Sequence, residues 1–101
     1  MRGIAHRLSG KTIVITGASS GIGRSTAFEF ARTQPRDLKL VLCARRIERL
    51  EQVKREINNE VGNGVKVHAA ELDISKLSEI AAFVDALPPD FRQIDVLVNN
   101  A

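Results

Sequence analysis

A glycine-rich run near the N-terminus has spacing that suits a phosphate-binding turn. Gly17, Gly21 and Gly23 follow the apolar, β-branched residues 13–15 in the pattern Thr-Gly-x-x-x-Gly-x-Gly. Gly17 can adopt the angles of a tight turn, Gly21 leaves room for a phosphate at the main chain, and Gly23 allows close helix–strand packing. The following helix would direct its free N–H groups and positive dipole end at the turn. We therefore predict an anion site there, with the pyrophosphate of a dinucleotide as its natural ligand.

Two consecutive arginines, Arg45 and Arg46, follow the second apolar segment of the chain. In dinucleotide-binding domains this corner usually carries an acid that binds the ribose 2′-hydroxyl, whereas arginine suits a 2′-phosphate. Both residues also stand at the start of a predicted helix, where each positive charge costs about 0.3–1 kcal/mol unless an anion offsets it. The alternative is a solvated basic corner softened by Glu48. We favour phosphate recognition, and hence NADP over NAD.

The elements that position these residues alternate regularly along the chain. Apolar runs predict strands at 12–16, 38–44, 65–72 and 94–98, and helical periodicity predicts helices at 24–33, 47–61 and 75–87. This order gives a parallel sheet with right-handed crossovers and the strand order 3-2-1-4. The sequence thus predicts an α/β fold, a Rossmann-type doubly wound sheet cut off after its fourth strand. Its ligand would lie at the carboxyl ends of strands 1 and 4, where the winding reverses.

Each predicted helix has an apolar face that should pack on the sheet. In the first helix this face is Ala27, Phe30 and Ala31. In the second it is Ile47, Leu50, Val53 (or Lys54), Ile57 and Val61. In the third helix, which Ser75 can cap, it is Leu77, Ile80, Ala81, Val84 and Leu87.

Composition restricts the class of protein. A chain of 101 residues forms at most one small domain, and its 15 Lys and Arg are scattered among 12 acids. With four Phe and no Tyr or Trp, nucleic-acid binding is disfavoured. One cysteine excludes an internal disulfide, and we find no signal peptide or membrane span. We therefore expect a soluble, cytoplasmic protein with neither a nucleic-acid nor a membrane partner.

The remaining residues with reactive side chains point to structure. Cys43 lies within an apolar strand and is expected to be a buried small hydrophobe. His68 alternates with apolar residues on a strand, with no acid or cysteine at ligand spacing, so we expect a structural or exposed role. His6 is expected to be solvated. We predict no metal site.

Three motifs in order resemble those of the short-chain dehydrogenase/reductase family: TGASSGIG from Thr16, LDI from Leu72 and NNA from Asn99. The likeness covers Leu8 to Ala101. It implies that Asp73 accepts from the adenine amino group, Ile74 lies against the ring, and Asn100 contacts the ribose and main chain. Asp73 is alternatively a helix N-terminal acid, and Asn99 is expected to satisfy sheet backbone. The cofactor-binding residues so predicted are Gly17, Ala18, Ser19, Ser20, Gly21, Ile22, Gly23, Arg45, Arg46, Asp73, Ile74 and Asn100.

Ser20 stands where some NADP-dependent members of the family carry a second basic residue, so the NADP preference depends on Arg45 and Arg46. The stretches KLVLCARRIERLEQVK and LPPDFRQIDVLVNNA are similar to NADP-dependent 3-hydroxy acid dehydrogenases that act on serine and allo-threonine. This resemblance implies oxidation of a 3-hydroxyl group by hydride transfer to NADP in a homotetramer.

The family's catalytic residues are a Tyr acid/base, a Lys four residues later that lowers its pKa, a Ser and an Asn. All lie beyond the position matching Ala101, and this chain has no Tyr. We therefore expect residues 1–101 to form a partial NAD(P)-binding Rossmann domain that has no catalytic residue and is inactive alone. The alternative is a non-catalytic dinucleotide-binding or interaction fragment.

Overall fold

The computed structural model describes residues 8–73 and 76–100, which form a four-stranded parallel sheet in the order β3-β2-β1-β4. Strand β1 (Thr12–Thr16) pairs with β2 (Leu38–Ala44) on one side and with β4 (Val96–Val98) on the other. Strand β3 (Val65–Glu71) pairs with the far side of β2. The predicted α/β doubly wound sheet and its order are confirmed.

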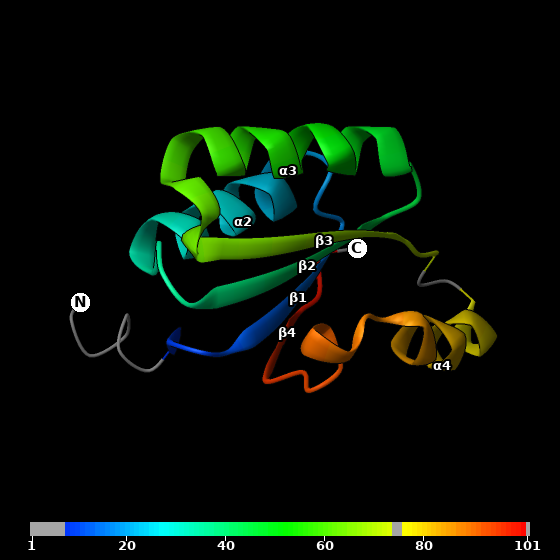
Figure 1. The fold of residues 1–101 in the computed structure, drawn as a ribbon. Helices are drawn as coiled ribbons and strands as arrows, with labels where there is room; N and C mark the ends of the chain where they lie inside the picture. The colour runs from blue at the N-terminus through cyan, green and yellow to red at the C-terminus, as the bar shows by residue number, and fades with distance from the viewer. Residues whose placement is uncertain (1–7, 74–75, 101) are drawn as a thin grey trace.

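Three helices connect the strands: α2 (Gly21–Thr33), α3 (Ile47–Val61) and α4 (Leu77–Ala86). Helices α2 and α3 cover one face of the sheet, and α4 lies on the opposite side, mostly past the ends of the strands (Figure 1). Short 3-10 helices at Gly62–Gly64 and Pro89–Phe91 precede β3 and β4. Helix α2 begins three residues before the predicted start, directly at the glycine turn, while β4 begins two residues after its predicted start. The predicted cap Ser75 lies outside the described residues.

The main core fills the space between the sheet and the helices α2 and α3. Ile13 and Ile15 of β1 face this core, whereas Val14 faces the other side, as the strand period of two requires. Leu50, Val53 and Ile57 of α3 are buried as predicted. In α2 Ala27 and Ala31 are buried as predicted, and Phe30 is half-buried and packs against this core. The buried aromatic residue of α2 is Phe28, which the prediction missed.

Helix α4 differs most from the prediction. Of its expected apolar face, only Leu87, just past the helix end, is buried; Val84 is half-buried, and Ile80 and Ala81 are exposed. The side chain of Leu77 lies outside the description. The reason is position: α4 lies mostly beyond the end of the sheet (Figure 1), so most of its apolar side chains have no described surface to pack against.

No helix in the part of the chain that the structure describes is long and apolar enough to cross a membrane.

Candidate functional site

A cavity of about 1240 Å³ opens at the carboxyl ends of β1, β2 and β3. It brings together nine of the residues predicted from the sequence: Gly17, Ser19, Ser20, Ile22, Gly23, Arg45, Arg46, Asp73 and Asn100. Ala44, Arg49 and Leu72 also line it.

Three predicted residues are not among those lining this cavity. Ala18 is fully buried, and its backbone N–H donates to the carbonyl of Cys43 at 3.0 Å, so it ties the glycine turn to β2. Gly21 lines a neighbouring, mainly apolar hollow. Ile74 lies outside the described residues. Contact of these three with a cofactor stays a prediction.

The glycine turn has the backbone geometry that requires glycine. Gly17 has a φ of 61°, and a Cβ placed on it would lie 2.6 Å from the carbonyl oxygen of Asn100. A Cβ on Gly23 would overlap the carbonyl oxygen of Gly17, so the close approach here is between the helix and the turn that follows β1. Gly21 has a φ of 58°, and the space where its Cβ would stand is open. The turn therefore offers unobstructed main chain at the start of α2.

The N-terminus of α2 is left uncapped by side chains. Ser20 is the N-cap residue and makes no side-chain cap hydrogen bond, and the first turn contains no acid. The N–H of Arg24 donates to the carbonyl of Ser20 at 3.3 Å, which leaves the N–H groups before it without intrahelical acceptors. Together with the positive end of the helix dipole, these donors favour an anion.

Asn100 leaves a hydrogen-bond donor unsatisfied beside the cavity. Its side-chain Nδ2 is buried and has no hydrogen-bond partner among the described residues. Its backbone N–H donates to the hydroxyl of Thr16 at 3.0 Å, and that hydroxyl donates to Oδ1 of Asn99 at 2.9 Å. Sequence reasoning missed Thr16, which joins the end of β1 to the segment after β4. Its position just before Gly17 was the available signal.

The charge of the cavity is predominantly positive. Arg45 follows β2, Arg46 is the N-cap residue of α3, and Arg49 lies in the first turn of α3. All three are exposed and form no ion pair within the described residues, and the one carboxylate lining the cavity is Asp73. Sequence reasoning missed Arg49, although its place three residues after Arg46 was a usable signal. Electrostatics therefore favour an anionic ligand.

The reactive side chains outside the cavity have structural roles. Cys43 is fully buried, which confirms its prediction, and burial raises the pKa of its thiol to about 12. His68 is half-buried with its ring 5.5 Å from that of Phe91, and burial is the main reason that its pKa is lowered. The described residues contain no group of three or more His, Cys, Asp or Glu side chains that could hold a metal ion.

The arrangement can bind an anion but provides little for catalysis. Within the described part of the chain, no Tyr, Lys, His or Cys side chain lines the cavity. The chain as a whole contains no Tyr.

Comparison with known proteins agrees with the fold and the motifs. A curated relative, the NADP-dependent 3-hydroxy acid dehydrogenase of Schizosaccharomyces pombe, is 48% identical over 95 residues, which are 94% of this chain and 35% of that protein. Human retinol dehydrogenase 13 is 36% identical over 94 residues, 93% of this chain and 27% of that protein. The chain thus spans between about a quarter and about a third of the length of these relatives.

A solved structure of L-sorbose reductase from Gluconobacter frateurii, in complex with NADPH and L-sorbose, superposes with a TM-score of 0.80 at 37% identity. The match covers 93% of this chain and 34% of that protein. Residues 11–101 match the family model described as short chain dehydrogenase. The chain belongs to the short-chain dehydrogenase family.

Proposed function

We propose that this chain is the NADP(H)-binding half of a longer short-chain dehydrogenase/reductase. That longer protein is called the full-length enzyme. The observation that carries this proposal is the cavity at the carboxyl ends of the strands, where an uncapped helix N-terminus and unpaired arginines meet. Both features suit a ligand with separate phosphate groups.

The residues present fit a dinucleotide phosphate. The open space at Gly21 and the free N–H groups of α2 suit the pyrophosphate, and Arg45 and Arg46 suit the 2′-phosphate. Asp73 would accept from the adenine amino group, with Ile74 against the ring. Asn100, whose Nδ2 has no partner among the described residues, would bind near the ribose. When bound, NADP supplies the hydride acceptor.

For the full-length enzyme we propose oxidation of the 3-hydroxyl group of small hydroxy acids such as serine. Support comes from the S. pombe relative, which is an NADP-dependent 3-hydroxy acid dehydrogenase. We further propose a cytoplasmic homotetramer, in keeping with the resemblance. The full-length enzyme should reduce NADP in the presence of serine, and residues 1–101 alone should not, because they contain no Tyr. NADP reduction with secondary alcohols but not with hydroxy acids would overturn the substrate assignment.

Coenzyme choice is tested with Arg45→Asp in the full-length enzyme. Charge-assisted Arg–phosphate bonds contribute about 1.5–3 kcal/mol each, so the variant should bind NADP about tenfold or more weakly while NAD affinity changes little. Isothermal titration calorimetry gives the dissociation constants of both NADP and NAD. Arg36→Asp is the control, because Arg36 is exposed in the segment before β2, at the opposite end of the strand. Equal losses for both coenzymes would remove Arg45 from 2′-phosphate recognition.

A further inference from the structure

Arg49 lines the same cavity as Arg45 and Arg46. It is exposed and belongs to the first turn of α3, the helix that begins directly after those two residues. Nothing in the fold requires a cation here, since Arg49 makes no hydrogen bond or ion pair with any described residue. Its guanidinium is therefore available to a ligand.

The start of α3 has no capping box and no side-chain cap hydrogen bond. In a capping box the N-cap and N3 side chains, which reach across the first turn, are Ser or Thr and Glu. In α3 these positions hold Arg46 and Arg49, with no side-chain cap hydrogen bond, and Glu48 is the one acid of the first turn. Two cations at the positive end of the dipole are unfavourable by themselves and favourable around a dianion.

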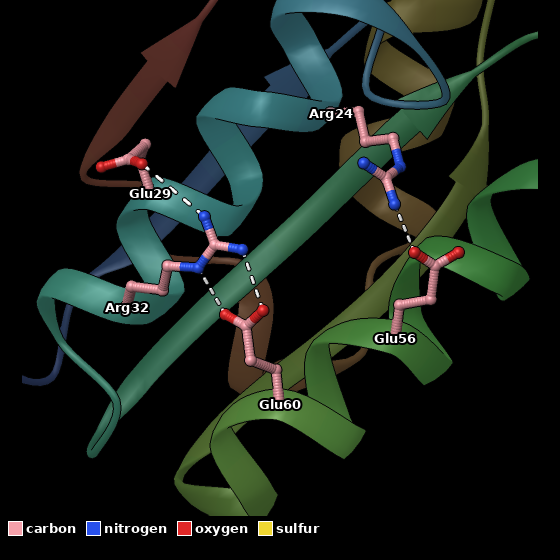
Figure 2. A network of polar contacts seen from close by, with 5 residues as sticks. All are labelled: Arg24, Glu29, Arg32, Glu56 and Glu60. Atoms are coloured by element: carbon pink, nitrogen blue, oxygen red, sulfur yellow. Dashed lines mark hydrogen bonds and ion pairs between the residues drawn. The ribbon is translucent and has the colours of Figure 1, made fainter.

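Two arginines of the neighbouring helix α2 are neutralised by glutamates of α3. Figure 2 shows Arg24 paired with Glu56, and Arg32 paired with Glu60 through two hydrogen bonds of 2.5 and 2.8 Å. Among the described residues no carboxylate forms an ion pair with the arginines of the cavity, although Asp73 lines the same cavity and Glu48 lies in the first turn of α3. Arg45, Arg46 and Arg49 therefore differ from Arg24 and Arg32 in having no acid partner among the described residues, and these three arginines are the ones that line the cavity.

We propose that Arg49 is a specificity-determining residue, whose guanidinium binds the adenosine 2′-phosphate together with Arg45 and Arg46 and so selects NADP over NAD. The planar fork of an arginine suits phosphate oxygens and donates several hydrogen bonds at once. This assignment rests on the proposed function, because it takes the dinucleotide as the ligand. A guanidinium that stacked on the adenine ring would instead strengthen binding of both coenzymes alike.

The test compares Arg49→Gln, Arg49→Lys and Arg55→Gln in the full-length enzyme. Arg55 is the matched control, because it is an exposed arginine of the same helix that does not line the cavity. Arg49→Gln should weaken NADP binding about fivefold to tenfold and NAD binding less than about twofold. Arg49→Lys should retain part of the preference, since it keeps the charge but loses the fork. Arg55→Gln should leave both constants unchanged.

The outcomes separate this assignment from the proposed function. If Arg49→Gln lost equal affinity for NADP and NAD, or lost no more affinity than Arg55→Gln, the role of Arg49 would be overturned. The proposed NADP function would still stand if the wild-type protein preferred NADP. Wild-type protein that bound neither coenzyme, or bound both equally, would overturn the proposed NADP function and the role of Arg49 with it. Circular dichroism of each variant checks that the secondary structure is intact.

Discussion

At the scale of single residues, the glycines of the turn differ in what surrounds them. A Cβ on Gly23 would overlap the carbonyl oxygen of Gly17, whereas one on Gly21 would meet nothing within 4 Å. The protein itself therefore requires glycine at position 23 for packing. At position 21 the surroundings leave room for a side chain, and the positive φ costs a non-glycine residue about 1–2 kcal/mol. The open space at Gly21 is where we place the pyrophosphate.

We expect Gly21→Val to abolish dinucleotide binding in a protein that still folds, because the branched side chain would occupy the space of the pyrophosphate. Gly23→Val should instead disrupt the turn and lower the melting temperature strongly. Cofactor affinity and far-UV circular dichroism, measured together on the full-length enzyme, distinguish the two effects. A folded Gly21→Val variant with unchanged affinity would contradict this placement of the pyrophosphate.

His68 should make stability depend on pH. Its pKa is lowered, first by burial and then by the charge of Lys54, while Glu51 acts in the opposite direction. The folded protein thus holds a neutral ring, whereas the unfolded chain binds a proton below about pH 6.5. The contribution is present above that pH and is lost as the pH falls toward the lower folded pKa.

We expect the melting temperature of wild-type protein to fall between about pH 7 and 5, and this fall to be smaller in His68→Gln. Differential scanning calorimetry across that range measures both. His6 is present in both proteins and cancels in the comparison. An identical pH profile in the variant would show that the folded ring titrates as freely as the unfolded one.

At the scale of elements, ion pairs join α2 to α3, and the two arginines of α2 that form them lie over an aromatic ring of the same helix. The guanidinium of Arg24 lies 4.7 Å from the centroid of the Phe28 ring, and that of Arg32 lies 5.2 Å from it. Each arginine also reaches a glutamate of α3, as Figure 2 shows. The ring is buried while the ion pairs are solvated, so the ring should carry most of the energy.

We predict that Phe28→Ala lowers the free energy of unfolding by about 3–5 kcal/mol, because it removes a buried aromatic ring and leaves a cavity. Glu60→Gln should cost far less, because its partner Arg32 stays hydrated. Urea unfolding of the full-length enzyme gives the change in the free energy of unfolding for both variants. The dependence of this free energy on urea concentration should be the same in each protein. A loss for Glu60→Gln as large as that for Phe28→Ala would mean that the ion pairs dominate the contact between the helices.

The sequence predicted the sheet and the inner helices because their periodicity is set by burial. The bounds of the strands at 12–16 and 38–44 were predicted correctly, since short, mainly apolar runs suit strands covered on both faces. In α4 the same pattern was misleading. Apolar residues at helical spacing show that one face of a helix is apolar, but they do not show whether another element covers that face. In α4 the face is largely uncovered, and Ile80 is 38% exposed.

Residues of the candidate site could be predicted where their role follows from their own side-chain charge or from the backbone conformation that they allow. The glycines were predicted from their spacing between a strand and a helix, and Arg45 and Arg46 from their charge and their place after the second strand; the structure places most of these residues around one cavity. Thr16 and Arg49 were missed for different reasons. The position of Thr16 just before Gly17 was visible in the sequence, but its hydrogen bonds are made with residues more than 80 positions away, which local patterns do not reveal. Arg49 looked like an ordinary polar residue of an amphipathic helix.

At the scale of the whole molecule, three large apolar side chains of the described residues are exposed: Ile22 of α2, Ile80 of α4 and Leu97 of β4. Strand β4 lies at the edge of the sheet, and Leu97 within it is 65% exposed. On the helical side of the sheet, a hollow of about 550 Å³ is lined by Leu8, Ile22 and Phe30, with Ile22 77% exposed. An edge strand with apolar side chains is a template for pairing with another chain.

We therefore expect residues 1–101, expressed as such, to be weakly folded and to associate as concentration rises. The free edge of β4 would pair with another copy, and a domain this small has little stability in reserve. Leu97→Lys should reduce the association, because a charged residue on an edge strand opposes pairing, whereas Ile80→Lys on α4 should have less effect. Sedimentation velocity at several concentrations and a thermal melt test this. A monomer with a sharp cooperative melt would contradict the expectation. Equal effects of Leu97→Lys and Ile80→Lys would mean that the copies associate through exposed apolar surface in general and not through the edge of β4.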